Sequence, residues 1–302
     1  MILGYLSRLL FISLAVFFLA HLVLGLLVAL VTHPALRFAR RMEARLAARW
    51  MMMLRLLPAA GAIFLVLAVC LPSYLWLEPD APAERVGFVS LGAALLAATM
   101  WGISLARVWR AAVRSRRLST TDRDAPNLAL AGILRPRLIV SPAVRRALTP
   151  AQLAAAMRHE RAHWTSRDNL KRLCMLLAPP FALGGKIDCA WQMFSEWAAD
   201  DYAADGSADC ACALAEALVR VARLSANSPV APLAATLIGD RDELAARVDR
   251  LLRADPSAAP SAGGHPILAF TAMLATAGAT AIALFNPEAL ASVHRVLERL
   301  IS

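Results

Sequence analysis

The sequence predicts a mainly α-helical protein that crosses a membrane about four times and carries a water-facing domain between its third and fourth spans. The 302 residues are 59% hydrophobic and 18% charged, whereas soluble domains contain about 45–50% apolar and about 25% charged residues. Four stretches almost free of charge are each about as long as the 20 residues that a helix needs to cross roughly 30 Å of hydrocarbon. This composition also excludes a disordered chain, which would have low hydrophobicity.

Three of the four predicted spans lie in the first third of the chain. They are Leu9–Leu36, whose most apolar part is Leu9–Thr32, then Leu56–Leu77 and Val86–Ala106. The first run is longer than the apolar core of a signal peptide and is followed by arginines, so we expect a retained membrane helix. The fourth predicted span is Ile267–Phe285.

Arginines predict the orientation of these spans. The Thr32–Leu56 loop contains six arginines and one acid, Glu43, and further arginines follow the third span from Arg107 onward. The positive-inside rule then places the N-terminus outside, the long region after the third span in the cytoplasm and the C-terminal tail outside. We expect a bacterial plasma membrane. The net charge of +10 is explained by this pattern beside the bilayer, so no nucleic-acid partner is expected.

The chain therefore divides into three predicted parts: residues 1–106 with three spans, a cytoplasmic domain at 107–264, and residues 265–302 with the fourth span and a short tail. Within the domain, proline and β-branched residues make Leu134–Ser141 a predicted edge strand or part of a small sheet. The other local predictions are a polar linker at Ser115–Asn127, a membrane-surface or re-entrant segment at Leu173–Gly185, helices at Ala208–Ala226 and Asp240–Ala254, and a hinge at Asp255–Gly264.

The run His159-Glu160-Arg161-Ala162-His163 is the strongest sign of chemistry. Its helix has a predicted start, because Thr149 can cap it, Pro150 suits its first position and Gln152 completes a capping box. Two histidines four residues apart lie on one helical face and can bind one Zn²⁺, while Glu160 beside them can take a proton from the water that attacks the substrate. The alternative is a pair of surface histidines on a charged helix.

A catalytic zinc site needs a third protein ligand. Glu196 and Asp200 lie one turn apart on a predicted helix, so Glu196 can bind the metal while Asp200 accepts a hydrogen bond from a ligand histidine. The alternative for these two acids is a solvated helix face. The remaining histidines, at positions 21, 33, 265 and 294, fall in or beside predicted spans. Weaker candidates to stabilise the oxyanion are Tyr202, Arg247 and His265, for which we favour a structural or surface role.

These motifs, together with Arg167-Asp168-Asn169, the predicted strand and the late run Arg247-Val248-Asp249-Arg250-Leu251-Leu252, resemble the BlaR/MecR-type integral-membrane zinc metallopeptidases. The resemblance covers nearly the whole chain. It implies a gluzincin-like domain with Zn²⁺ on His159, His163 and Glu196, Glu160 as general base and acid, and regulated cytoplasmic proteolysis of a protein substrate such as a transcriptional repressor. Asp168 and Asn169 would support the active helix, or else form a surface turn. The antibiotic receptors of that family carry a large sensor domain where this sequence has only Glu288–Ser302, so the resemblance does not extend to β-lactam sensing.

Two other interpretations stay open. One is an HtpX-type quality-control protease with similar zinc ligands, whose substrates are misfolded membrane proteins. The other is a membrane signalling scaffold with a structural zinc, although a structural site has no need of Glu160. For the enzyme, we expect the substrate to lie extended along the Leu134–Ser141 strand.

Overall fold

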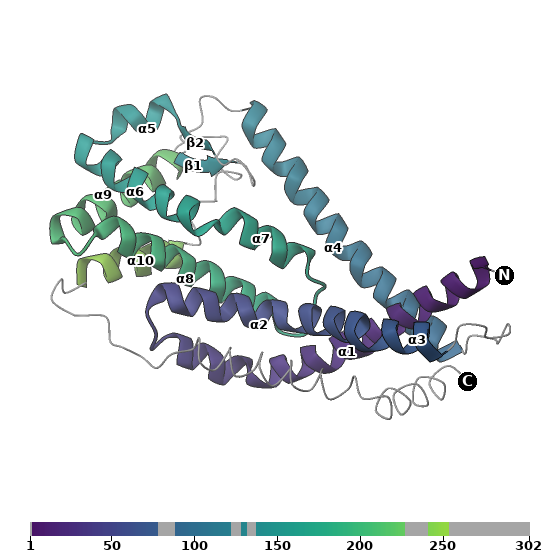
Figure 1. The fold of residues 1–302 in the computed structure, drawn as a ribbon. Coiled ribbons are helices and arrows are strands. Elements are labelled where there is room, and N and C mark those ends of the chain that lie inside the picture. Colours follow the sequence, from purple (N-terminus) through teal and green to yellow (C-terminus); the bar gives the residue numbers. More distant parts are fainter. Residues whose placement is uncertain (1, 78–87, 122–127, 132–136, 227–240, 254–302) are drawn as a thin grey trace.

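A computed structural model describes residues 2–77, 88–121, 128–131, 137–226 and 241–253 (Figure 1). The predicted fourth span Ile267–Phe285, the predicted hinge before it, and His265 and His294 lie outside the described residues. The described part is mainly α-helical, with a single two-stranded sheet.

Three described helices are long and apolar enough to cross a membrane, as the sequence predicts for the first three spans. Helix α1 (Ile2–Ala39) forms an antiparallel hairpin with α2 (Ala44–Leu65), which continues through the π-helical segment η1 (Val66–Cys70) into α3 (Leu71–Leu77) (Figure 1). Helix α4 (Phe88–Thr121) runs from the hairpin to the small sheet. The candidate spans are Ser7–Ala39, Ala44–Leu75 and Phe88–Val113.

Two predicted connections prove to be helical, which corrects the sequence analysis. The Thr32–Leu56 segment belongs mostly to α1 and α2, and only residues 40–43 connect them. Similarly, α4 continues to Thr121 through the first part of the predicted linker Ser115–Asn127. The reason is that arginine and alanine are strong helix formers: charge marks the end of the apolar run, but it does not end the helix. The 38 residues of α1 measure about 57 Å, well beyond about 30 Å of hydrocarbon.

The region after α4 begins with an antiparallel pair, β1 (Leu128–Ala131) and β2 (Arg137–Val140), and β2 falls inside the predicted strand. Six helices follow: α5 (Pro142–Ala147), α6 (Pro150–Ser166), α7 (Asp168–Leu177), α8 (Gly184–Ala204), α9 (Ala208–Ala226) and α10 (Arg241–Arg253). The helices predicted at Ala208–Ala226 and Asp240–Ala254 are thus confirmed, the second over its described residues Arg241–Arg253.

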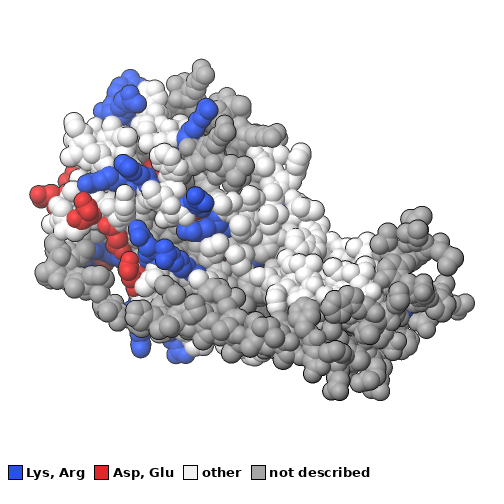
Figure 2. Space-filling model, viewed as in Figure 1, with Lys and Arg blue, Asp and Glu red and all other residues white. Residues whose placement is uncertain are grey.

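Helix α8 joins the two parts of the molecule, because it lies between α2 on one side and α6 on the other (Figure 1). Its residues Ile187, Trp191 and Phe194 share a buried core with Met51 of α2 and Met175 of α7. Figure 2 shows one face of the molecule, with most of its charged side chains gathered on the left, where the elements from β1 to α10 lie. The described surface farther to the right, over the candidate spans, is almost uncharged. Helix α8 is therefore packed directly against a candidate membrane span.

Candidate metal centre

Local sequence determines where the helix of the two histidines begins. The Thr149 hydroxyl accepts a hydrogen bond from the Gln152 backbone N–H (3.3 Å), and the Gln152 side-chain oxygen accepts one from the Thr149 backbone N–H (3.1 Å). With Pro150 in the first turn, this is the predicted capping box. The helix ends at Arg167, whose positive φ of 55° starts α7 in a new direction. This arrangement sets His159 and His163 one turn apart on α6, close to the start of α7.

The two imidazoles meet the carboxylate of Glu196 from α8. The Nε2 atoms of His159 and His163 are 3.2 Å apart. Glu196 Oε2 lies 3.4 Å from His159 Nε2, and Glu196 Oε1 lies 3.7 Å from His163 Nε2. His159, Glu160 and Glu196 are buried. Among the described residues, His159, His163 and Glu196 form the group of metal-ligand type whose donor atoms all lie within 4.8 Å of one another.

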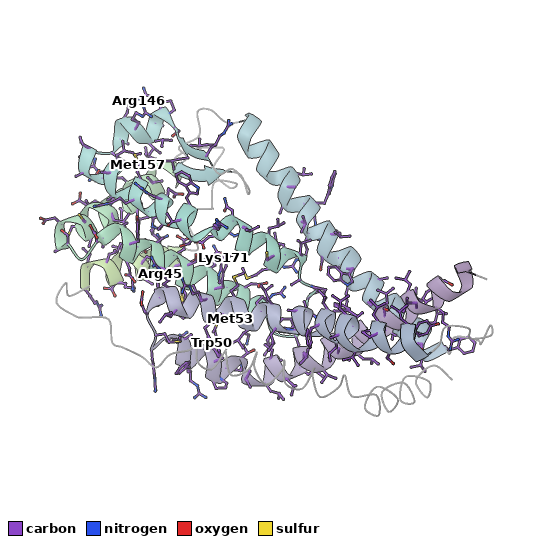
Figure 3. The ribbon with its side chains drawn as sticks, in the orientation of Figure 1. Arg45, Trp50, Met53, Arg146, Met157 and Lys171 are labelled. Carbon is purple, nitrogen blue, oxygen red and sulfur yellow. The ribbon has the colours of Figure 1, made fainter. Side chains whose placement is uncertain are left out.

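Each imidazole has a carboxylate at its other nitrogen. His159 Nδ1 is 3.0 Å from Asp200 Oδ1, on the same helix as Glu196. His163 Nδ1 is 2.8 Å from Asp168 Oδ2, at the first position of α7. Asp168 also accepts hydrogen bonds from the Ser195 hydroxyl (2.8 Å) and the Lys171 ammonium (2.7 Å; Lys171 is labelled in Figure 3). The sequence predicts the Asp200 contact, but for Asp168 and Asn169 it predicts only support of the active helix or a surface turn, and the direct contact of Asp168 with His163 goes beyond that expectation.

Arg247 of α10 connects two of these acids. Its Nε and Nη2 atoms donate to Asp200 Oδ2 and Oδ1 at 2.9 and 2.7 Å, and its Nη1 lies 3.1 Å from Glu196 Oε2. The side chain is only 3% exposed. The structural role favoured from the sequence fits this position, but the sequence analysis missed its partners. A signal was present, because Arg247 stands among Leu244, Val248 and Leu251, which pack into a buried cluster.

The protonation of the site follows from these contacts. Burial works against a charged imidazole, but hydrogen bonds to Asp168 and Glu196 raise the pKa of His163 to about 10. The pKa of His159 is also raised: burial again lowers it, and Asp200 and Glu196 outweigh that effect. Burial raises the pKa of Glu160, and the neighbouring imidazoles only partly oppose this. Although burial raises the pKa of Glu196, hydrogen bonds from the two histidines hold it well below its usual range.

The donor set fits a zinc ion. When Nδ1 of each imidazole donates to a carboxylate, the lone pairs of both Nε2 atoms point into the space between the rings and the Glu196 carboxylate. Two nitrogen ligands about 2.05 Å from a tetrahedral Zn²⁺ lie about 3.3 Å apart, close to the 3.2 Å seen here. Two buried lone pairs at this distance repel unless a proton or a metal cation lies between them, and two imidazoles with one carboxylate are ligands that Zn²⁺ prefers.

Four other side chains that could bind a metal or donate a hydrogen bond lie elsewhere. Asp201 is exposed and forms a bidentate pair with Arg250 at 2.6 and 2.8 Å, while Tyr202 is also exposed. His21 is buried in α1, where its Nε2 lies 3.3 Å from the Pro180 carbonyl oxygen, and His33 is exposed on α1. Neither histidine belongs to the group of metal-ligand type found in the described part of the chain.

Comparison with known proteins identifies the region that holds the site. The family model of Peptidase family M48 matches residues 106–236, which include the whole of α6, α7, α8 and α9. No curated protein and no solved structure gives a significant match to the chain.

Proposed function

We propose that this protein is a membrane endopeptidase that cuts protein substrates on the cytoplasmic side, and that residues 106–236, which the family model of Peptidase family M48 matches, are its zinc metallopeptidase domain. The observation that carries the proposal is the convergence of His159, His163 and Glu196, each braced by a buried partner. A structural zinc needs four protein ligands, and three donors leave one position open for water or substrate.

In this proposal His159, His163 and Glu196 hold the metal. Bound zinc supplies an activated water and polarises the peptide carbonyl. Glu160 takes the proton from the attacking water and then delivers it to the leaving amine. Burial supports this role, because it raises the pKa of the Glu160 carboxyl toward the range in which a group can both accept and donate a proton.

Asp200 and Asp168 orient the two imidazoles by accepting their Nδ1 protons. Arg247 binds both Asp200 and Glu196. It therefore keeps the ligand Glu196 and the support of the ligand His159 in a fixed geometry when substrate binds. We assign the positioning of His163 to Asp168, and Asn169 beside it stays a predicted support of the active helix.

The small sheet supports an extended mode of substrate binding. Strand β2 pairs with β1 along one edge, and its residues Leu138 and Ile139 are exposed. A peptide that adds to β2 as a further strand would gain backbone hydrogen bonds, which are independent of the side chains of the substrate. This fits an enzyme that accepts unfolded or flexible segments.

The orientation and the substrate rest on sequence features. Arginines beside the candidate spans support a cytoplasmic site, and the likeness to BlaR/MecR-type peptidases supports regulated proteolysis of one protein, such as a repressor. Quality control of many membrane proteins is the second candidate. Both candidates use the same site and differ in what it cuts.

The variant Glu160→Gln tests the proposal. It removes the base and keeps the ligands, so zinc should stay bound while activity falls by at least about 10²–10⁴. Substrates trapped on this variant in cells and identified by mass spectrometry distinguish the candidates: one soluble regulator supports signalling, whereas many unrelated membrane proteins support quality control. Equal hydrolysis of casein by the variant and the wild type would refute the mechanism, and a zinc-loaded wild type that cuts nothing would indicate a scaffold.

A further inference from the structure

Arg55 is a charged side chain buried inside a candidate membrane span. It lies in the Ala44–Leu75 span, and only 1% of it is exposed. Its Nε donates to Asp188 Oδ1 of α8 at 2.8 Å. Its two Nη atoms donate to the backbone carbonyls that end α7 and follow it, which are Met175 (3.2 Å), Ala178 (3.3 Å) and Pro179 (3.4 Å). The guanidinium also lies over the ring of Phe181, 5.3 Å from its centroid.

Such a residue is costly in a membrane helix, and intramembrane charges commonly mark function. The partners of Arg55 all come from α7, from the α7–α8 turn and from α8. Helices α7 and α8 also carry residues of the candidate metal centre. Arginine suits this role, because its planar fork of five N–H donors can satisfy an acid and several carbonyls together. A positive charge at the carbonyl end of α7 is also favourable to the dipole of that helix.

The α7–α8 turn lies between α1 and α2. Phe181 packs against Gly25 of α1, where a Cβ on the glycine would lie 3.0 Å from the Phe181 Cβ. The Pro180 carbonyl oxygen lies 3.3 Å from His21 Nε2, also on α1. The absence of a side chain at Gly25 therefore lets the turn approach α1 closely, while Arg55 of α2 holds it from the other side. This turn belongs to the segment Leu173–Gly185, for which the sequence predicts a membrane-surface or re-entrant position.

Both helices held by Arg55 lead to the metal centre. Helix α7 begins with Asp168, which contacts His163, and ends at the carbonyls that Arg55 binds. From Asp168 to Met175 is seven residues, or about 10 Å of rigid helix. On α8, Asp188 precedes Glu196 by eight residues, or about 12 Å. Arg55 therefore fixes the ends of α7 and α8 that lie farther from the metal centre. Helix α8 supplies the proposed ligand Glu196, and α7 supplies Asp168, which supports the ligand His163.

We propose that Arg55 is a positioning residue that couples the membrane helices to the peptidase site: it fixes α7 and α8 relative to each other, so that Asp168 and Glu196 reach the two imidazoles together. This inference rests on the ligand roles proposed above for His159, His163 and Glu196. It implies that a displacement of α2 against α1 changes zinc binding and catalysis. Core packing of α8 on α2 through Met51, Trp191 and Phe194 transmits such a displacement along the helix.

The test compares full-length Arg55→Lys and Asp188→Asn with the wild type in lipid vesicles. Lysine keeps the charge but loses the planar fork, and asparagine keeps the shape but loses the charge. We expect both variants to insert, to bind zinc about 10–100-fold more weakly in competition with a chromogenic chelator, and to show a kcat lowered by a similar factor at saturating zinc, with KM unchanged. The matched control is Arg250→Lys, which alters another arginine that pairs with an aspartate of α8 but at an exposed site, and it should match the wild type.

The readouts separate positioning from simple stabilisation. If either variant melts at a lower temperature but keeps the zinc affinity and the kcat of the wild type, Arg55 only stabilises the fold and the proposal is wrong. The same holds if Arg250→Lys produces an equal loss. Zinc affinity is measured without substrate, so a wild type that binds zinc but cleaves nothing overturns the proposed function, while the affinity comparison still tests the role of Arg55.

Discussion

Neighbouring acids on α8 should respond very differently to the same substitution. Asp200 is 1% exposed and lies between His159 Nδ1 and the guanidinium of Arg247, whereas the Asp201 side chain is 46% exposed and pairs with Arg250 at the surface. Replacing each with alanine removes one carboxylate and one bidentate arginine pair. The two variants differ in the burial of the arginine pair and in the contact of Asp200 with His159.

The magnitudes follow from burial. Asp200→Ala leaves the Arg247 cation, itself 3% exposed, with Glu196 as the acid that remains at 3.1 Å. Breaking one side of a buried pair costs about 3–5 kcal/mol. The exposed pair of Asp201 with Arg250 contributes about 0–1 kcal/mol. The variants should therefore differ by at least about 2 kcal/mol in the free energy of unfolding, which is about 30-fold in the equilibrium constant.

The assay is denaturant unfolding of the zinc-free proteins in the same detergent, together with zinc affinity by chelator competition. We expect Asp200→Ala to weaken zinc binding by about 10–100-fold, because the His159 ring loses the acceptor at its Nδ1. Asp201→Ala should bind zinc as the wild type does. Glu196→Ala, which removes a proposed ligand, should retain little zinc.

Two results would refute this reasoning. Equal losses of stability in Asp200→Ala and Asp201→Ala would show that the buried position of Asp200 carries no special cost. Loss of zinc from Asp201→Ala with retention by Glu196→Ala would mean that the wrong face of α8 points at the metal.

Three further predictions concern the same site and its orientation. Asp168→Asn should weaken zinc binding by about 10–100-fold in chelator competition, because it replaces the carboxylate that faces His163 Nδ1 at 2.8 Å; unchanged affinity would remove Asp168 from the site. Burial lowers the pKa of His163, but Asp168 and Glu196 raise it to about 10 without metal. This imidazole is therefore protonated on both nitrogens at pH 7, and it must lose one proton to bind zinc. Apparent zinc affinity should therefore rise from pH 6 to pH 8, with proton release detectable by calorimetry in buffers of different ionisation enthalpy, and a flat profile would contradict the pKa. A periplasm-active reporter should be silent when fused after Asp124 and active after Ser302, whereas the reverse pattern would place the metal centre outside.

Local signals in the sequence predicted the elements that depend on near neighbours. The capping box at Thr149 and Gln152 determines the start of α6 through contacts three residues apart, and the spacing of His159 and His163 needs nothing beyond the helical period. The ends of the candidate membrane helices were predicted poorly. The end of an apolar run indicates where a helix leaves the hydrocarbon, but it does not indicate where the helix itself ends. Arginine and alanine continue α1, α2 and α4 beyond the apolar runs.

Contacts between distant residues escaped the sequence analysis. Arg55 and Asp188 are separated by 133 positions, and Arg247 and Asp200 by 47. Charge counting assigned Arg55 to the basic loop that orients the first spans. In the structure it lies on the buried side of α2 and binds α7 and α8, so it belongs to the connection between the candidate spans and the metal centre.

The two arginines nevertheless share a pattern that is visible in the sequence. Arg247 lies among the buried Leu251 and the partly buried Leu244 and Val248, and Arg55 follows Met51 and Leu54, which are buried. A cation on the apolar stripe of an amphipathic helix cannot reach water, so it must find a buried acid or a set of carbonyls. Among the described residues both arginines find their acids on α8: Arg247 binds the buried Asp200 and Glu196, and Arg55 binds Asp188, which is partly exposed. The position of a charge in the hydrophobic period, more than the number of charges, therefore identifies which arginines belong to the catalytic region and which only flank the bilayer.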